Sequence, residues 1–254
     1  MAIDRRGLGG EIGGMERQSI YRGLARYYDL LYSFKDYEKE AEILRQLIAK
    51  HQKSKGRDLL EVACGTGGHA RYLKEGFRVV ATDLNAGVLA VARRRTKGVT
   101  FKQADMLTLN LGREFDVIVC LFSSIGYVKS YANLKRVLRH FARHLKPGGV
   151  VVIEPWFAPS AYETGSAHLS TYQGSGVKIA RACVSRARGN VSVMDMHYLI
   201  AESGKGVKHF IDRHELGMFE RGKFLRLMEE AGLKARFEKN GLMKERGLYI
   251  GMKR

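Results

Sequence analysis

A glycine-rich segment, EVACGTGG, occupies residues 61–68. Its glycines allow a tight backbone turn and let a ligand approach without a Cβ in the way. The segment ends a short apolar run at 58–63, which predicts a strand, and ligands of open α/β sheets bind at the carboxyl ends of strands. The lysine of a P-loop and the third glycine of the dinucleotide fingerprint are absent, which disfavours both of those sites.

Two acidic residues follow the next two predicted strands. Asp83 ends the second strand, where a carboxylate can accept hydrogen bonds from both ribose hydroxyls of a nucleoside. Asp105 stands just past the third strand, where an acid can accept from the exocyclic amine of adenine while the N–H of Met106 donates to the ring. A glycine-rich stop, LKPGG, stands at 145–149 before the fifth strand. These elements predict a nucleoside-containing cofactor at one edge of the sheet.

In register, these four elements resemble class I S-adenosylmethionine-dependent methyltransferases over about residues 57–154. The resemblance implies that the glycine turn holds the methionine part of the cofactor, Asp83 the ribose, and Asp105 and Met106 the adenine. The cofactor-binding residues that it implies are Tyr37, Glu61, Ala63, Cys64, Gly65, Gly67, Asp83, Leu84, Asp105, Met106 and Leu121. An NAD-dependent enzyme and a methyltransferase-like domain without activity remain open alternatives, and no metal site is predicted.

Five further motifs lie outside these elements or at their ends. They are YDLLY at 28–32, FSSIGY at 122–127, EPW at 154–156, HYL at 197–199 and RGLY at 246–249. This set resembles the N,N-dimethyltransferases that act on nucleotide-linked amino sugars in macrolide biosynthesis, from Tyr28 to Gly251. The resemblance implies an amine, or a hydroxyl, of a small nucleotide-linked sugar as the methyl acceptor.

The same resemblance places Tyr28, Glu154, Tyr198 and Arg246 in the substrate pocket. A guanidinium fork suits a diphosphate because it pairs with phosphate oxygens, although Arg246 can equally be a surface arginine before the last strand. Trp156 is the only tryptophan and can stack on a sugar or a base. We therefore predict Tyr28, Trp156, Tyr198 and Arg246 as substrate-binding residues.

One residue departs from the pattern of the amino-sugar enzymes. They have histidine after Ser-Ser-Ile-Gly, whereas this chain has Tyr127. Histidine can take a proton from an ammonium group near neutral pH, but tyrosine, with a reference pKa of about 10, does so poorly. Either the base differs, or the amine arrives neutral, or the substrate is another molecule. Tyr127 and Glu154 are the candidate catalytic residues that would stabilise or remove the proton.

Strands and helices alternate between residues 58 and 154, which predicts βαβ units and a parallel sheet with helices on both faces. The predicted strands are 58–63, 78–82, 99–103, 115–122 and 150–154, with helices at 67–74, 85–95 and 131–145. Helices at 19–32 and 36–52 precede them, and a helix at 221–231 with strands at 233–238 and 248–252 completes the core. We expect an α/β fold with a Rossmann-like seven-stranded methyltransferase sheet.

After Trp156 the pattern changes to alternation of apolar and polar residues, with turn signals at 174–176, 189–190 and 203–206. We expect about four antiparallel strands that hold the substrate and, with the helix of Tyr28, cover the cofactor. The predicted organisation is a disordered tail at 1–18, where Met15 can be the true start, a core of 19–156 and 220–254, and an antiparallel β insertion at 157–219.

The formal net charge is +18, which favours anionic partners such as phosphorylated small molecules or nucleic acid. A surface shaped by genome-wide composition is the alternative. An RNA methyltransferase is second to a small-molecule enzyme, because no RNA module is appended and FSSI stands where an Asn-Pro-Pro-Tyr motif would be. A basic binding protein with a relic cofactor site is the non-enzyme alternative. A homodimer is compatible with all of these.

Cys64, Cys120 and Cys183 have no paired spacing and fit a reducing compartment. The amino-terminal residues lack the apolar stretch of a secretory signal, and no segment is apolar enough to cross a membrane. We therefore expect a cytoplasmic protein that does not associate with membranes.

Overall fold

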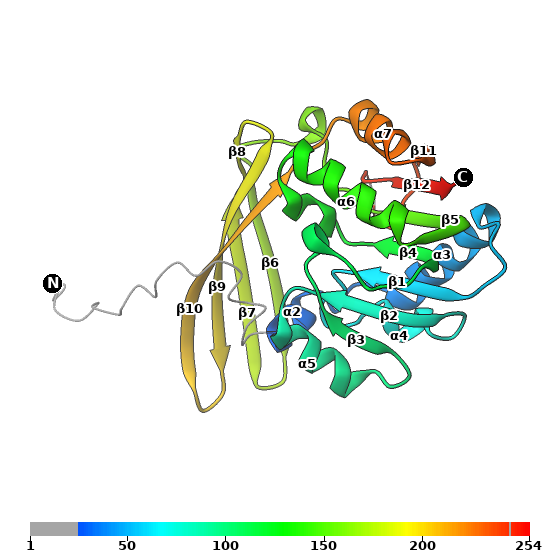
Figure 1. The fold of residues 1–254 in the computed structure, drawn as a ribbon. Coiled ribbons are helices and arrows are strands. Elements are labelled where there is room, and N and C mark those ends of the chain that lie inside the picture. The colour runs from blue at the N-terminus through cyan, green and yellow to red at the C-terminus, as the bar shows by residue number, and fades with distance from the viewer. Residues whose placement is uncertain (1–24, 244) are drawn as a thin grey trace, which may run out of the picture.

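The computed structural model describes residues 25–243 and 245–254, which form two β-sheets with helices around the first (Figure 1). The tail predicted at 1–18 and the predicted helix before Ala25 lie outside these residues. The described end of that helix is α2 (Ala25–Leu31). No helix in the described ranges is long and apolar enough to cross a membrane.

The first sheet has seven strands in the order β11-β12-β5-β4-β1-β2-β3, and only β12 runs antiparallel to its neighbours. The bounds are β1 (Asp58–Val62), β2 (Arg78–Asp83), β3 (Thr100–Gln103), β4 (Phe115–Cys120), β5 (Leu145–Ile153), β11 (Leu233–Glu238) and β12 (Leu248–Lys253). All residues of β1 and β4 are buried, as expected for parallel strands covered on both faces. The predicted Rossmann-like fold class is confirmed.

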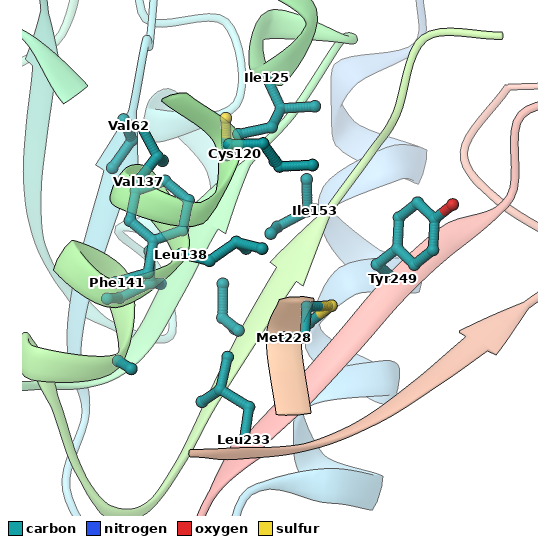
Figure 2. Close-up of a cluster of buried hydrophobic side chains, with 14 of the residues drawn as sticks. Val62, Cys120, Ile125, Val137, Leu138, Phe141, Ile153, Met228, Leu233 and Tyr249 are labelled. Carbon is teal, nitrogen blue, oxygen red and sulfur yellow. The ribbon is translucent and has the colours of Figure 1, made fainter. Parts of the chain in front are cut away.

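Helices cover both faces of this sheet, and the strands send alternate side chains into two cores. Leu60 and Ile118 pack toward α6 and α7, whereas Leu59 and Val117 pack toward α3 and α5. Figure 2 shows the first of these cores, with Phe141 of α6 and Met228 of α7 beside the strands. The helix bounds are α3 (Tyr37–His51), α4 (Ala70–Leu73), α5 (Ala86–Arg95), α6 (Tyr131–Arg143) and α7 (Arg221–Glu230), with short 3-10 turns η1 (Met106–Thr108), η2 (Ser124–Val128) and η3 (Pro159–Ala161).

Two sequence predictions of element bounds were wrong near glycines. The helix predicted at 67–74 shrinks to α4, because Gly67 has φ of +82° and continues the turn instead of starting a helix. The helix predicted to reach residue 145 ends at Arg143, and the LKPGG segment belongs to β5. This segment joins the sheet because Leu145 pairs with Phe115 of β4, before the pairing of β4 with β5 shifts in register.

The second sheet is antiparallel and has the order β10-β9-β7-β6, with β8 paired to β9. Its strands are β6 (Ala167–Gly174), β7 (Val177–Val184), β8 (Arg186–Arg188), β9 (Val191–Glu202) and β10 (Gly206–Gly217). The sequence predicted about four strands. The fifth is β8, which follows β7 after Ser185 and pairs with β9. The inward face packs on α2 through Tyr27, Leu31, Tyr198 and Ile200. In Figure 1 this sheet stands beside the first sheet. Strand β10 contacts η2, which follows β4.

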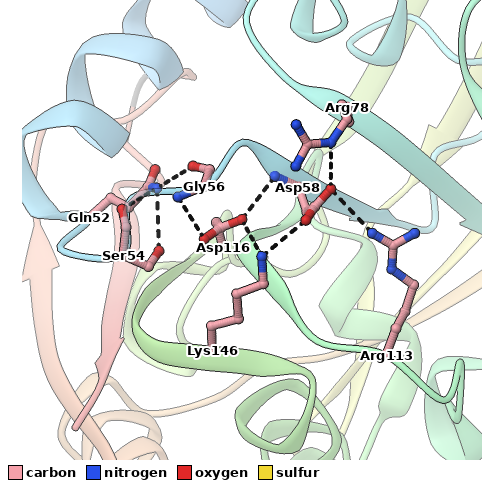
Figure 3. Close-up of polar contacts among 8 residues, drawn as sticks. All are labelled: Gln52, Ser54, Gly56, Asp58, Arg78, Arg113, Asp116 and Lys146. Carbon is pink, nitrogen blue, oxygen red and sulfur yellow. Dashed lines mark hydrogen bonds and ion pairs between the residues drawn. The ribbon is translucent and has the colours of Figure 1, made fainter.

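A polar network joins the strands at the opposite edge of the first sheet (Figure 3). Asp116 is buried, and its carboxylate accepts from the N–H groups of Gly56 (3.1 Å) and Asp58 (3.0 Å) and from Lys146 (2.8 Å). The carboxylate of Asp58 accepts in turn from Lys146 and from Arg78. These contacts tie β1, β2, β4 and β5 together away from the site.

Replacing Asp116 by alanine should lower the free energy of unfolding by about 3 kcal/mol, because the N–H groups of Gly56 and Asp58 lose their acceptor and Lys146 loses one of its two. The matched control is Glu114→Ala, since Glu114 is half exposed and pairs with Lys253 at 3.3 Å. That variant should change stability by less than about 0.5 kcal/mol. Urea unfolding curves of equal slope measure both changes. Equal midpoints for the two variants would show that the network does not stabilise the sheet.

Candidate active site

A cavity of about 870 Å³ lies between the carboxyl ends of the first sheet's strands and the inward face of the second sheet. Its walls come from the glycine turn after β1, from η2, from β7, β9 and β10, and from the segment before β12. The predicted residues that line it are Tyr37, Glu61, Ala63, Cys64, Gly65, Asp83, Leu84, Asp105, Met106, Leu121, Tyr127, Trp156, Tyr198 and Arg246. Residues far apart in the sequence thus meet in one cavity.

Three of the predicted site residues lie elsewhere or cannot be placed. Gly67 is not part of the lining and packs toward Ala92 and Phe101. Glu154 is fully buried behind the wall. Tyr28 belongs to α2, but its side chain lies outside the described part of the structure.

Left-handed backbone marks the edge of the sheet that faces the cavity. Ala63, Phe122 and Ser123 have φ of 57°, 51° and 62°, although none of them is glycine. Such conformations are strained and gather at functional sites, where the surrounding structure maintains them. Here Glu154 maintains the turn after β4, because its Oε2 accepts from the N–H of Phe122 at 2.6 Å. Its second oxygen has no hydrogen-bond partner among the described residues, and burial raises the pKa of this carboxyl.

Asp83 connects the ends of two neighbouring strands. Its Oδ2 accepts from the N–H of Gly65 at 2.8 Å and its Oδ1 from the N–H of Asn85 at 2.9 Å. Burial raises the pKa of its carboxyl, and these backbone donors oppose the shift. Each carboxylate oxygen can accept a second hydrogen bond, so two adjacent hydroxyl groups of a ribose can still bind there.

Glu61 lies beside Asp83 at the bottom of the cavity. It is 2% exposed, and its Oε2 has no hydrogen-bond partner among the described residues. Burial, followed by the neighbouring charge of Asp83, raises the pKa of its carboxyl to about 8. A second acid, Glu40, is held nearby by His69 (2.6 Å) and Lys35 (2.5 Å). A buried acceptor without a donor beside a second carboxylate suits a cationic ligand.

Asp105 supplies the third acid at this end of the cavity. Its Oδ1 accepts from the N–H of Leu107 at 2.8 Å, which caps η1 and fixes the side chain. The predicted adenine contacts, Asp105 and Met106, therefore lie next to each other on the cavity wall.

The other end of the cavity carries guanidinium groups. Arg246 donates to the hydroxyl of Ser123 at 2.8 Å and lies 4.7 Å from the ring centre of Trp156. Arg181 donates to the hydroxyls of Tyr32 (2.7 Å) and Ser170 (3.1 Å). Within the described ranges neither arginine has a carboxylate at ion-pair distance. Burial lowers the pKa of the Arg246 guanidinium, and an anionic ligand would offset that cost.

Tyr127 lies on η2 and faces the second sheet. Its hydroxyl oxygen is 2.7 Å from Nδ1 of His214 on β10, and both side chains line the cavity. The site therefore contains a histidine that contacts Tyr127.

Sequence reasoning missed several residues of this cavity, among them Arg181 and His214, and it placed Tyr32 only in the cover of the site. Alternation along β7 and β10 was visible in the sequence and would have placed Arg181 and His214 on one face. It could not show which face looks inward, because that depends on how the second sheet packs against the first.

Comparisons with known proteins agree with this geometry. A family model described as a methyltransferase domain matches residues 59–149. The dTDP-3-amino-3,6-dideoxy-alpha-D-glucopyranose N,N-dimethyltransferase of Streptomyces fradiae is 37% identical, over 92% of this chain and 93% of its own. The crystal structure of DesVI from Streptomyces venezuelae superposes with a TM-score of 0.86 at 35% identity, covering 91% of this chain and 98% of that one. The chain belongs to the amino-sugar N,N-dimethyltransferases, a group of class I methyltransferases.

A third similarity comes from the S-adenosylmethionine-bound structure of CalS10, an amino pentose methyltransferase from Micromonospora echinaspora. Its TM-score is 0.81 at 29% identity, with coverage of 90% of this chain and 97% of that one. The cofactor of this methyltransferase is S-adenosylmethionine, as the sequence predicted. The acidic end of the cavity fits it, since Glu61 and Asp83 can face the ammonium group and the ribose of that cation.

The raised pKa of Glu61 predicts that cofactor binding releases a proton. At about pH 7 this carboxyl is mostly protonated in the free enzyme, and a bound cation favours the ionised form. S-adenosylhomocysteine should therefore bind more tightly as the pH rises toward about 8, with no further gain from this group above it. Calorimetry in buffers of different ionisation enthalpy measures the protons released.

The variant Glu61→Gln should bind without this proton release and without its pH dependence. Glu163→Gln is the matched control, because Glu163 also lines the cavity but is exposed. Equal proton release by wild type and Glu61→Gln would show that another group titrates.

Proposed function

We propose that this enzyme transfers two methyl groups from S-adenosylmethionine to the amine of a dTDP-linked amino sugar. Two relatives with high coverage are N,N-dimethyltransferases of dTDP-3-amino sugars, from Streptomyces fradiae at 37% and Streptomyces venezuelae at 36% identity. A third, from Saccharopolyspora spinosa, acts on a dTDP-4-amino sugar and is 33% identical. The position of the amine on the sugar ring is therefore open between these two classes.

The division of charge within the cavity carries this proposal. Glu61, Asp83 and Asp105 line one end, and Arg246 and Arg181 line the other. Acids favour the cationic methyl donor, and arginine forks favour the diphosphate of a sugar nucleotide. The two guanidinium groups lie on either side of one aromatic pair, Tyr32 and Phe122, whose ring centres are 5.1 Å apart. Arg181 donates a hydrogen bond to the hydroxyl of Tyr32, and the guanidinium of Arg246 lies 6.0 Å from the ring centre of Phe122.

When bound, S-adenosylmethionine supplies a methyl group that its sulfonium already activates. The chain mainly contributes alignment, which can lower a barrier by roughly 7–11 kcal/mol. Asp83 and the glycine turn would hold the donor, while Arg246 and Trp156 would hold the sugar nucleotide from the other end. The sugar amine would then lie between them, on the part of the wall formed by Leu121 and Tyr127.

Helix α2 lies against the glycine turn, next to Tyr32 of the cavity wall. Asp29 of this helix accepts a hydrogen bond from Thr66 at 2.7 Å and also contacts Arg95. At the second sheet, the hydroxyl of Tyr27 donates to Glu202 at 3.1 Å. These contacts hold the helix between the two sheets, where it keeps water from the reacting atoms.

Methyl transfer to dTDP-3-amino-3,6-dideoxyglucose and to a dTDP-4-amino sugar tests the proposal directly. With labelled cofactor, mass spectrometry should show first one and then two added methyl groups. RNA methylation is the alternative that the net charge of +18 leaves open. Label on tRNA or rRNA and none on any sugar nucleotide would contradict the proposal and favour that alternative.

Arg246→Gln should raise the KM for the sugar nucleotide roughly 10–100-fold, because it removes a charge-assisted hydrogen bond to phosphate. The KM for S-adenosylmethionine should stay the same. Arg226→Gln is the control, since Arg226 is exposed on α7 and outside the cavity. Steady-state kinetics measure both constants, and an unchanged sugar-nucleotide KM in Arg246→Gln would remove this residue from the diphosphate site.

The homodimer and the cytoplasmic location remain predictions. The outward face of the second sheet exposes four apolar side chains by more than half: Leu169, Val184, Leu199 and Val207. Exposed apolar groups on one face are typical of an interaction surface, and a second copy would cover them. Sedimentation should then show a dimer for the wild type and a monomer for Leu199→Lys, whereas a monomeric wild type contradicts the prediction.

A further inference from the structure

We infer that Tyr127, His214 and Asp212 form a proton relay that deprotonates the sugar ammonium before methyl transfer. This inference rests on the proposed function, because it requires an amine as acceptor. An ammonium group has no lone pair, so the enzyme must remove a proton before nitrogen can attack the methyl carbon. Tyr127 touches the substrate in this assignment, and His214 and Asp212 act through it.

The first link joins η2 to β10. The hydroxyl oxygen of Tyr127 lies 2.7 Å from Nδ1 of His214, which is a short hydrogen bond between side chains that both line the cavity. The neighbouring glycine permits this approach, since a Cβ on Gly126 would lie 2.9 Å from the side chain of Leu216. A larger residue at 126 would push η2 away from β10 and lengthen the Tyr127 contact.

The second link is electrostatic. Nε2 of His214 lies at an ion-pair distance of 3.1 Å from Oδ2 of Asp212, which is fully buried two residues earlier on the same inward face of β10. The contact lacks the geometry of a hydrogen bond. A carboxylate beside Nε2 favours the tautomer with the proton on that nitrogen. Nδ1 is then left without a proton and accepts from Tyr127.

Burial gives the relay its driving force. His214 is 6% exposed and Asp212 is 0% exposed. Among the described residues, neither oxygen of Asp212 has a hydrogen bond of good geometry, so its charge is poorly compensated while His214 is neutral. A proton on His214 creates an imidazolium against this carboxylate, which stabilises both charges.

The other ionisable groups around the relay do not compete for this role. Lys129, which also lines the cavity, pairs with Glu215 at 2.6 Å, and Glu215 points to the opposite face of β10. Burial, and to a smaller extent the charge of Asp212, raises the pKa of the Tyr198 phenol on β9 above that of an ordinary tyrosine. This phenol is therefore a weak acid that keeps its proton.

Two proton transfers carry the positive charge from the ammonium group to His214. One N–H bond of the ammonium breaks as an O–H bond forms on Tyr127, and the original O–H bond of Tyr127 breaks as an N–H bond forms on His214. The amine gains its lone pair, and the positive charge moves to the imidazolium beside Asp212. The imidazolium returns its proton to water before the next round, which prepares the same amine for its second methyl group.

This relay accounts for the tyrosine at position 127. The amino-sugar enzymes that the sequence resembles have histidine at that position. In this chain the histidine comes from β10, and the phenol of Tyr127 bridges it to the amine. An ordinary tyrosine is a poor base, but one that passes its own proton to a histidine needs no phenolate.

The variant His214→Asn tests the inference, because its side-chain oxygen can still accept from Tyr127 but cannot take a proton. We expect kcat near pH 7 to fall roughly 100-fold, with calorimetric affinity for S-adenosylhomocysteine unchanged. The remaining activity should rise with pH as the amine loses its proton in solution. His209→Asn is the matched control, since His209 lies on the same strand and is exposed on its outward face.

A rescue experiment separates proton transfer from a structural role. Adding Tyr127→His to His214→Asn places a base at the position that faces the acceptor in this proposal, and should recover at least ten-fold of the lost kcat. Asp212→Asn in the wild-type background should lower kcat and shift the pH profile upward. Loss of activity in His214→Asn with an unshifted pH profile and no rescue would overturn the relay.

Nitrogen-15 NMR of histidine-labelled enzyme tests the relay without any substrate. His214 should carry its neutral proton on Nε2, with Nδ1 hydrogen-bonded, and Tyr127→Phe should remove that hydrogen bond. A proton on Nδ1 would overturn the relay even if the enzyme methylates sugars. If the wild type instead shows the expected tautomer but methylates no amino sugar, the proposed substrate fails and the assignment of the relay to an ammonium fails with it.

Discussion

The hydrogen bond from the N–H of Gly65 to Asp83 is the contact on which the site depends. It joins the turn after β1 to the end of β2, so that the carboxylate and the glycine turn hold one fixed relation. Both carboxylate oxygens of Asp83 accept hydrogen bonds from backbone N–H groups, which keeps this buried acid in one orientation before any ligand binds. Acceptors that are already ordered can bind a ribose without a further loss of side-chain conformational entropy.

Buried ionisable groups without a partner of opposite charge among the described residues are the common feature of the cavity. Glu61 lies at one end without a donor for one of its oxygens, and Arg246 lies at the other without a carboxylate at ion-pair distance among the described residues. Each group would be stabilised by a ligand of opposite sign. In the proposed function, a cationic methyl donor and an anionic sugar nucleotide would supply these charges from opposite directions, which would also orient the reacting atoms toward each other.

Two buried acidic residues, Glu154 and Asp212, have different partners in the structure, and their positions in the sequence do not reveal this. The sequence predicted Glu154 as a residue that stabilises or removes the proton of the amine, and in the structure its carboxylate holds the left-handed turn at Phe122. Asp212, inside the insertion, carried no motif and is buried beside His214. The difference arises from which way each strand presents its side chains, and a shift of one residue reverses it.

The sequence alone determined the class of fold and the cofactor end of the site. Glycines, strand-end acids and capping residues act through backbone geometry within a few positions, so their spacing could be interpreted without a structure, as the cap of α3 by Asp36 illustrates. The tertiary structure alone decided the acceptor end. Arg181, Tyr32 and His214 come from separate elements, and only the packing of the second sheet and α2 against the first sheet brings their side chains into one cavity.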